Sequence, residues 1–256
     1  MRAVVVGASS GLGRCIGVGL AKRGAQVALL ARRRERLEGA AAEAGEGALA
    51  IECDVTEPSS VSSAIGKAAA DLGGIDAIVY TPAIGPLSRL LDTDADTWRR
   101  VFEINVTGAS LVTAAAISHL TESHGRALYL SSVSASLTPP WPGLGAYGVS
   151  KAALDKLIEA WRVEHPDVGF TRCIVGDCTG GEGDSATEFP MASDWDFDLL
   201  GELHPVWEAR GLLAGCFIEV EELVDAVDAV LRSGKSVATP SITLAPRPPA
   251  TTERTQ

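Results

Sequence analysis

The sequence of 256 residues has no excess of positive charge: 22 lysines and arginines stand against 33 aspartates and glutamates, a net charge of −11. Proteins that bind nucleic acid usually present a basic face to the phosphates, so this balance argues against a nucleic-acid partner. The sequence also shows no basic amphipathic stretch and no apolar run of about 18 residues, so we expect no membrane role. The first predicted strand begins at Arg2, which leaves no room for a signal peptide.

Cysteines and aromatic residues are scarce. The five cysteines are odd in number and show neither a disulfide framework nor the spacing of a zinc site, so we expect reduced thiols in a cytoplasmic protein. Aromatic residues make up 5%, whereas hydrophobic residues as a whole reach 46%. This composition is typical of helices packed closely on a sheet and argues against disorder.

Short apolar runs alternate with helical patterns along most of the chain. The predicted strands are 2–6, 26–31, 48–53, 75–80, 126–131, 168–175 and 236–244, and the predicted helices are 12–23, 33–44, 58–72, 95–122, 146–164 and 219–232. This alternation predicts parallel strands joined by right-handed crossovers. The expected fold is α/β, a doubly wound Rossmann-type parallel sheet of about seven strands with helices on both faces. We expect a single domain over residues 1–245.

Two segments depart from this alternation. Residues 176–218 are rich in Gly, Asp and Trp and contain no clear strand, so they are predicted to form a substrate loop or lid. Candidate walls of an apolar site are Trp195, Phe197 and Trp207 within it, and Trp141 and Leu144 before it; packing within the lid would explain the aromatic residues equally well. Residues 246–256 are predicted to form a flexible tail.

Residues 7–14 read GASSGLGR and join the first predicted strand to the first predicted helix. Gly7, Gly11 and Gly13 form the pattern G-x-x-x-G-x-G. A helix N-terminus offers free N–H groups and a positive dipole end, so a pyrophosphate can bind there. Glycine lets the backbone approach such a ligand closely. The pattern alone is equally compatible with a flexible turn.

Tyr147 and Lys151 lie one turn apart on a predicted helix. Residues at this spacing share a face, so the ammonium lies near the phenol. A phenol with a pKa of roughly 10 exchanges protons poorly at neutral pH. A neighbouring positive charge lowers that pKa toward the working range. The pair alone is equally compatible with a solvated helix face.

Joined together, these motifs resemble the short-chain dehydrogenase/reductase family over nearly the whole chain. Further matches, in order, are Asp54-Val55 after the third predicted strand, Asn105 in Glu-Ile-Asn-Val, and Leu-Ser-Ser at 130–132. The resemblance implies an oxidoreductase that interconverts a ketone or other carbonyl and a secondary alcohol by hydride transfer with a nicotinamide cofactor. It also implies a homodimer or homotetramer, assembled through the helices at 95–122 and 146–164.

The resemblance implies a role for each matching residue. The residues around the pyrophosphate and the adenosine ribose would be Gly7, Ser9, Ser10, Gly11, Leu12 and Gly13. Asp54 and Val55 would lie at the adenine edge, although a cap of the following turn explains Asp54 as well. Asn105 would hold a water in a proton relay, which is compatible with a buried structural amide. Tyr147 would exchange the proton with the substrate, and Lys151 would hold the nicotinamide ribose and lower the tyrosine pKa.

The catalytic serine has two candidates. Ser132 ends a predicted strand, where a side chain points into the crevice that binds ligands. It lies 15 residues before Tyr147, slightly more than is usual in the family, whereas Ser134 lies 13 before it. Strand register favours Ser132, and an insertion near Pro139-Pro140 would explain the spacing. Ser134 is the alternative.

The chain departs from the family pattern in several places. The family's Asn-Asn-Ala-Gly reads Tyr80-Thr81-Pro82-Ala83, its Pro-Gly pair reads Gly176-Asp177, and a glycine pair near the end is missing. These departures leave a second hypothesis, a non-catalytic nucleotide-binding regulator or interaction protein that kept the fold. The presence of Asn105, Tyr147 and Lys151 favours an active enzyme.

The end of the second predicted strand indicates the cofactor. NAD-preferring members carry an acidic residue about where Ala31 stands, and here Arg32-Arg33-Arg34 follows instead. A guanidinium binds a 2′-phosphate through two charge-assisted hydrogen bonds. A solvated helix start is the alternative, although cations there oppose the helix dipole. We predict NADP(H), with Arg32 on the 2′-phosphate.

Overall fold

The computed structural model describes residues 1–180 and 195–247. Within them, seven strands form one parallel sheet in the order β3-β2-β1-β4-β5-β6-β7. The strands are β1 Arg2–Val6, β2 Gln26–Ala31, β3 Leu49–Glu52, β4 Ala77–Tyr80, β5 Arg126–Ser132, β6 Gly169–Val175 and β7 Ser241–Leu244. The strand order reverses between β1 and β4, which opens a crevice at their carboxyl ends. The predicted doubly wound fold is confirmed.

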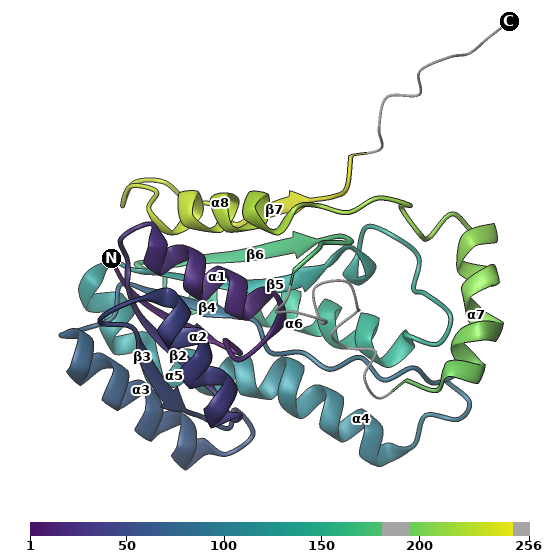
Figure 1. Cartoon of the computed structure of the whole chain (residues 1–256), viewed down its shortest axis with the longest axis horizontal. Helices are drawn as coiled ribbons and strands as arrows, with labels where there is room; N and C mark the ends of the chain where they lie inside the picture. Colours follow the sequence, from purple (N-terminus) through teal and green to yellow (C-terminus); the bar gives the residue numbers. More distant parts are fainter. Residues whose placement is uncertain (181–194, 248–256) are drawn as a thin grey trace, which may run out of the picture.

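Helices cover both faces of the sheet (Figure 1). They are α1 Gly11–Lys22, α2 Arg34–Ala44, α3 Pro58–Leu72, α4 Ala95–Phe102, α5 Gly108–Ser123, α6 Gly145–Glu164, α7 Phe197–Ala209 and α8 Val220–Leu231, with a π turn η1 at Glu103–Thr107 and a 3₁₀ turn η2 at Val133–Ala135. Side chains of β1 alternate between two cores: Val4 and Val6 pack with α3, α5 and α6, whereas Ala3 and Val5 pack with α1, α2 and α8. Burial on both faces explains why the central strands are continuous apolar runs.

The predicted loop at 176–218 contains a helix that the sequence prediction missed. Helix α7 begins after Asp196, whose side chain accepts hydrogen bonds from the N–H groups of Asp198 and Leu199. Pro205 lies inside the helix and hides it from a pattern-based prediction, because proline usually ends helices. Residues 181–194 of the predicted loop and 248–256 of the predicted tail lie outside the described residues.

The predicted helix at 95–122 is interrupted in the structure. The π turn η1 separates α4 from α5, and such turns often occur at functional sites. By length and composition, the stretch Ala95–Ser123 is apolar enough to cross a membrane, which corrects the expectation of no such run. Buried residues make up 44% of its most apolar window, and α5 contributes to the core beside α3. We therefore interpret it as a core helix of the α/β fold.

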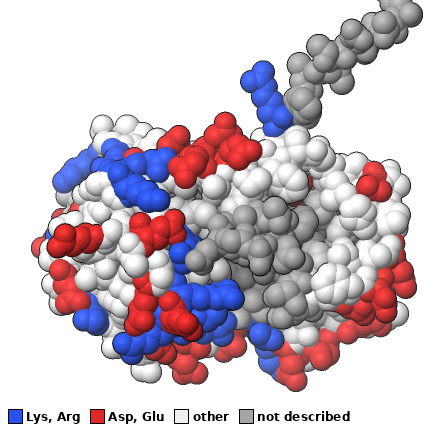
Figure 2. All heavy atoms as spheres, viewed as in Figure 1, with Lys and Arg blue, Asp and Glu red and all other residues white. Residues whose placement is uncertain are grey.

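Charged side chains of both signs are mixed on the surface. On the face in Figure 2, basic and acidic side chains are mixed on the left of the view, whereas the described part on the right is mostly uncharged, with acidic groups at its edge. This mixture of charges agrees with the net charge of −11.

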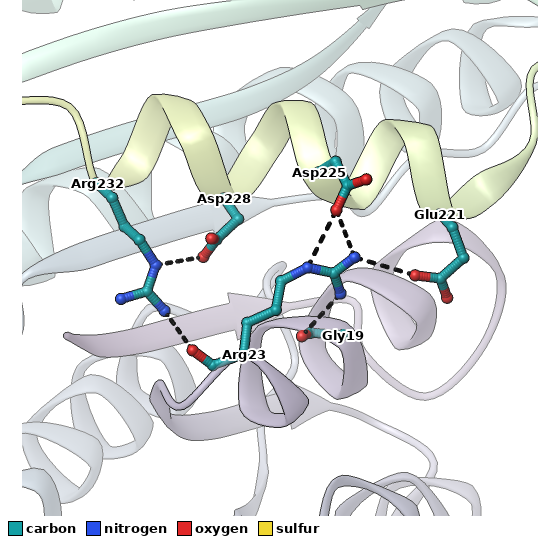
Figure 3. Close-up of polar contacts among 6 residues, drawn as sticks. All are labelled: Gly19, Arg23, Glu221, Asp225, Asp228 and Arg232. Carbon is teal, nitrogen blue, oxygen red and sulfur yellow. Dashed lines mark hydrogen bonds and ion pairs between the residues drawn. The ribbon is translucent and has the colours of Figure 1, made fainter.

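Ion pairs join α8 to α1 although these helices are about 200 positions apart in the sequence (Figure 3). Arg23, just after α1, donates hydrogen bonds to Asp225 Oδ1 (2.6 and 3.2 Å) and Glu221 Oε2 (3.1 Å). In the other direction, Arg232 donates to the backbone oxygen of Arg23 (2.9 Å). Exposed pairs of this kind contribute about 0–1 kcal/mol each. The two helices also share the core of that face, so α8 supports the helix whose N-terminus carries the glycine loop.

Candidate active site

A cavity of about 690 Å³ lies at the carboxyl ends of the central strands. Its walls come from the glycine loop, the ends of β2, β3 and β4, the segment after β5, the start of α6 and the segment after β6. All the residues predicted as catalytic or cofactor-binding line this cavity except Asn105. The topology thus brings together motifs that are spread over about 145 positions of sequence.

The glycine loop needs glycine because a threonine packs against it. Gly7 has φ +86°, a conformation that other residues rarely adopt. A Cβ on Gly7 or Gly13 would overlap the Oγ1 of Thr81, which donates a hydrogen bond to the backbone oxygen of Val6 (2.7 Å). Ser10, the N-cap of α1, makes no side-chain capping bond, so the first N–H groups of the helix remain for a ligand. The loop therefore fits the pyrophosphate of a dinucleotide.

Arg33, two residues after β2, binds the side chains of the glycine loop. Its guanidinium donates hydrogen bonds to Ser9 Oγ (3.0 Å) and Ser10 Oγ (2.5 Å). Burial, with the charges of Arg36 and Arg32, lowers the pKa of Arg33. A bound anion would relieve this repulsion. The sequence prediction named Arg32 and missed Arg33, although the run of three arginines was visible.

Arg32 and Arg34 differ in their surroundings. The side chain of Arg32 lines the cavity, and no hydrogen bond or ion pair engages it among the described residues. Arg34 instead donates to Glu38 Oε1 (2.9 Å), one turn along α2. Arg32 and Arg33 can therefore meet an anion in the cavity, whereas Arg34 is already paired outside it.

Asp54 caps a turn and also lines the cavity. Its Oδ1 accepts hydrogen bonds from the backbone N–H (3.0 Å) and the hydroxyl (2.8 Å) of Thr56. Burial opposes ionisation of the carboxyl, but these hydrogen bonds and the charge of Arg32 lower its pKa overall. The alternative that Asp54 caps the following turn is confirmed, while its position in the cavity keeps it available to the adenine end.

Tyr147 and Lys151 project from the first turns of α6 into the same cavity. The Nζ of Lys151 lies 5.7 Å from the centre of the Tyr147 ring and donates a hydrogen bond to the backbone oxygen of Leu130 (2.7 Å). Only 2% of Lys151 is exposed. Burial lowers its pKa to about 8, and the charge of Asp155 opposes that shift. The spacing of four residues thus places the ammonium near the phenol, as predicted. The predicted lowering of the Tyr147 pKa by Lys151 is not found, because burial raises that pKa and only Ser132 opposes the rise.

Of the two candidate serines, Ser132 is the one that meets Tyr147. Burial raises the pKa of Tyr147, and a hydrogen bond with the Ser132 side chain opposes that rise. Ser134 also lines the cavity, but it bonds to Ser132: its N–H donates to Ser132 Oγ (3.2 Å), and the two hydroxyls are 2.9 Å apart. The geometry favours Ser132, in agreement with strand register.

Asn105 lies in the π turn η1 and is fully buried. Its amide donates to the backbone oxygen of Ile84 and to Ser150 Oγ (2.9 Å each), and its Oδ1 accepts from the N–H of Ile84 (2.8 Å). These bonds tie the segment after β4 to α6. The interpretation as a buried structural amide fits this geometry, and the proton-relay role stays a prediction.

Three tryptophans form an apolar cluster beside the cavity. Trp195 and Trp207 each donate Nε1–H to a backbone oxygen, of Gly85 (2.7 Å) and Pro142 (2.9 Å), and Trp141 packs 5.2 Å from Trp207 between ring centres. Trp141, Leu144 and Trp195 line the cavity as expected, and Phe217 lines it as well. Trp207 does not line the cavity but packs in this cluster, as the alternative of packing within the lid predicts, and the expectation of a wall is wrong for Phe197, which is 71% exposed. Their helix, α7, was not predicted, so their orientations were not either.

Comparison with known proteins agrees with this geometry. The family model described as short chain dehydrogenase matches residues 1–177. A short chain dehydrogenase of Pseudocercospora fijiensis is 35% identical over 173 residues, 65% of this chain and 55% of the relative. An 11-beta-hydroxysteroid dehydrogenase A of Sesamum indicum is 33% identical over 179 residues, 68% of this chain and 51% of the relative. The chain thus spans about half the length of these curated relatives.

A solved structure extends the likeness to nearly the whole chain. The crystal structure of a short-chain type dehydrogenase/reductase from Mycobacterium marinum has a TM-score of 0.81 and 27% identity, and the match covers 95% of this chain and 93% of that one. The matched residues include the glycine loop and the Tyr147–Lys151 pair. The chain belongs to the short-chain dehydrogenase/reductase family, whose members are oxidoreductases that use nicotinamide cofactors on small molecules.

Proposed function

We propose that this protein is an NADP(H)-dependent oxidoreductase that interconverts a carbonyl compound and a secondary alcohol. The observation that carries the proposal is that Tyr147, Ser132 and Lys151 line one cavity with the glycine loop, with Lys151 Nζ 5.7 Å from the centre of the Tyr147 ring. A proton donor and a phosphate-binding loop on the walls of one cavity are what cofactor-dependent carbonyl reduction requires.

The chain's own residues handle the proton. When bound, the nicotinamide cofactor supplies or accepts the hydride. In carbonyl reduction, the Tyr147 hydroxyl gives its proton to the substrate oxygen, and the Ser132 hydroxyl donates a hydrogen bond to that same oxygen. The Lys151 ammonium stabilises the phenolate that remains. In alcohol oxidation, the same phenolate takes the proton back.

Arginines at the other end of the cavity select the phosphorylated cofactor. Arg32 lines the cavity and makes no hydrogen bond or ion pair with the described residues, and Arg33 already contacts two hydroxyls of the glycine loop. Ala31 stands where a carboxylate would favour an unphosphorylated ribose. Both guanidinium groups can bind a 2′-phosphate bidentately. This arrangement supports NADP(H) over NAD(H).

Three further assignments belong to the same proposal. The segment 176–218, with α7 and Phe217 among its described residues, shapes the substrate end of the cavity. Helix α6 presents Val149 and Val163, 49% and 82% exposed, which supports a homodimer or homotetramer through this side. The five free cysteines support a cytoplasmic location.

The test is a panel of ketones and secondary alcohols, each followed by the absorbance of NADPH, with the Tyr147→Phe variant as control. We expect at least one substrate to be turned over by the wild type, and turnover to fall by roughly 10²–10⁴ in Tyr147→Phe. NADPH affinity should stay the same, because the phenol does not contact the phosphates. Binding of NADPH without turnover of any substrate would instead favour a nucleotide-binding regulator.

A further inference from the structure

The helix that carries Tyr147 and Lys151 carries a third buried titratable residue on the same face, Asp155. The three are spaced four residues apart, so each lies one turn beyond the last. Only 5% of Asp155 is exposed, and it does not line the cavity. It therefore contacts neither cofactor nor substrate, and the reaction proposed above gives it no task.

The surroundings of Asp155 are poor in hydrogen bonds. Among the described residues, neither carboxylate oxygen nor the neighbouring Ser131 hydroxyl has a partner with hydrogen-bond geometry, although Ser131 is near enough to lower the pKa of Asp155. The nearest guanidinium nitrogen, Arg172 Nη1 on β6, lies 3.9 Å away and is closer to Glu159 (3.4 Å). A carboxyl group in such a place destabilises the fold unless a charge compensates it. If position 155 only filled space in the core, an apolar side chain would stabilise the fold more than a carboxylate does.

The compensating charge on the active-site side is the ammonium of Lys151. Helical side chains lean toward the N-terminus, so the Asp155 carboxyl lies over the turn that carries Lys151. Burial raises the pKa of Asp155, whereas Ser131, Arg172 and Lys151 oppose that rise. Reciprocally, Asp155 raises the pKa of Lys151 against the effect of burial.

The groups that face this pair come from every element packed against it. On α6 they are Tyr147 and Glu159. Strand β5 presents the Leu130 carbonyl and the hydroxyls of Ser131 and Ser132, and β6 presents Arg172. Glu159 lies one turn farther from Lys151 and pairs with Lys156 and Arg172. Asp155 is thus the carboxylate placed to act on Lys151.

We propose that Asp155 is a positioning residue of the active site, whose buried carboxylate keeps Lys151 protonated beside Tyr147. This inference rests on the proposed function for its consequence in catalysis, but the pairing itself concerns only residues of the folded chain. Without the carboxylate, Lys151 loses its proton at lower pH, and a neutral amine no longer stabilises the Tyr147 phenolate.

The first experiment is the pH profile of carbonyl reduction in Asp155→Asn, which keeps the shape and removes the charge. The fall of the rate at alkaline pH, which we call the alkaline limb, gives the apparent pKa for the first proton lost by the coupled Tyr147–Lys151 pair. We expect this limb to move to lower pH by about one unit, and Asp155→Glu to restore part of the shift. Glu159→Gln is the matched control on the same helix and should leave the limb in place. A rate that falls evenly at all pH values, with an unmoved limb, would mean a structural role only.

The second experiment needs no substrate, so its outcome is independent of the proposed function. The free energy of unfolding is measured for wild type, Asp155→Asn, Lys151→Met and the double variant, which form a double-mutant cycle. The coupling between the two residues should be favourable at pH 7 and lost well above the Lys151 pKa of about 8. The same coupling at both pH values would overturn the proposal. If Asp155→Asn fails to fold, recovery of folding in the double variant supports the pairing, and no recovery contradicts it.

Discussion

The Nζ of Lys151 donates a 2.7 Å hydrogen bond to the backbone oxygen of Leu130, in a site where only 2% of the lysine is exposed. Leu130 lies in β5, two residues before Ser132, whereas Lys151 lies on α6, one turn after Tyr147. One contact therefore fastens the helix that bears the phenol to the strand that bears the serine. Cofactor binding need not assemble these three groups, because the apo fold already holds them together.

The buried charge of Lys151 predicts a pH dependence of stability. Its pKa is about 8 in the folded protein, against 10.5 for an ordinary lysine. Between these values the unfolded chain binds one more proton than the folded protein, so the free energy of unfolding rises with pH. We expect this residue to contribute a rise of about 2–3 kcal/mol between pH 8 and pH 10.

Denaturant titrations of wild type and Lys151→Met across this pH range measure that contribution. The rise should be present in the wild type and absent from the variant. Lys156→Met is the control, because Lys156 lies on the same helix, is exposed and pairs with Glu159. If the free energy of unfolding rises equally with pH in wild type and Lys151→Met, burial does not lower the pKa of Lys151.

The two serines predict different kinetic losses. Ser132 ends β5 and opposes the rise in the pKa of Tyr147, whereas Ser134 lines the cavity and bonds to Ser132. Ser132→Ala should lower turnover by about tenfold to a hundredfold or more, because it removes a donor to the reacting oxygen. Ser134→Ala should change turnover by less than about threefold, as expected for the loss of a single neutral hydrogen bond. Cofactor affinity, measured by fluorescence titration, should be similar in both. The opposite order would assign the role to Ser134.

The space around two helical glycines predicts opposite effects on the free energy of unfolding. Gly13 lies in the glycine loop at the start of α1, and Gly66 lies in α3. A Cβ on Gly13 would overlap Thr81 Oγ1 and the backbone of Gly7, so Gly13→Ala should lower the free energy of unfolding by about 1–3 kcal/mol. It should also weaken cofactor binding, because the loop must move to admit the methyl group. A Cβ on Gly66 in α3 meets nothing within 4 Å, so Gly66→Ala should stabilise the protein by about 0.5–1 kcal/mol. Thermal and chemical unfolding of both variants tests this contrast, and a destabilised Gly66→Ala would contradict it.

Local sequence patterns were enough to predict the sheet and most of its helices. They did not predict helix α7 or the turn η1. Buried parallel strands are continuous apolar runs, so their alternation with amphipathic helices was enough to predict the seven-stranded sheet. Helix α7 was missed because Pro205 lies in its middle and residues around it are rich in Gly and Asp. The interruption η1 was missed because its sequence continues the apolar helical pattern of both neighbours.

The candidate site was predictable where function depends on spacing within one element. Tyr147 and Lys151 share a helix, so their spacing determines their relation. The contacts of Arg33 with Ser9 and of Thr81 with the glycine loop join segments 24 and more than 65 positions apart, and no local pattern encodes them. Asp155 and Lys151 have helical spacing, but the sequence does not show that both are buried, and the proposed coupling between them depends on that burial.

The last prediction concerns the arginines after β2, which offer three adjacent side chains in three different surroundings. Arg32 lines the cavity without a partner among the described residues, Arg33 donates to Ser9 and Ser10, and Arg34 pairs with Glu38. If Arg32 binds the 2′-phosphate, Arg32→Ala should weaken NADPH binding by about tenfold to a hundredfold, which is the cost of about 1.5–3 kcal/mol for a charge-assisted contact. NADH binding should hardly change, because NADH lacks that phosphate.

Arg33→Ala should act differently, because Arg33 also holds the hydroxyls of the glycine loop. We expect it to weaken both cofactors, and NADPH more than NADH, since the loop hydroxyls serve both and the charge serves only the phosphate. Arg34→Ala is the matched control and should leave both affinities within about twofold, since its ion pair is exposed and outside the cavity. Titration of each variant with NADPH and NADH separates the three cases. Equal losses for the two cofactors in Arg32→Ala would remove Arg32 from the 2′-phosphate, and a preference of the wild type for NADH would overturn the NADP(H) assignment itself.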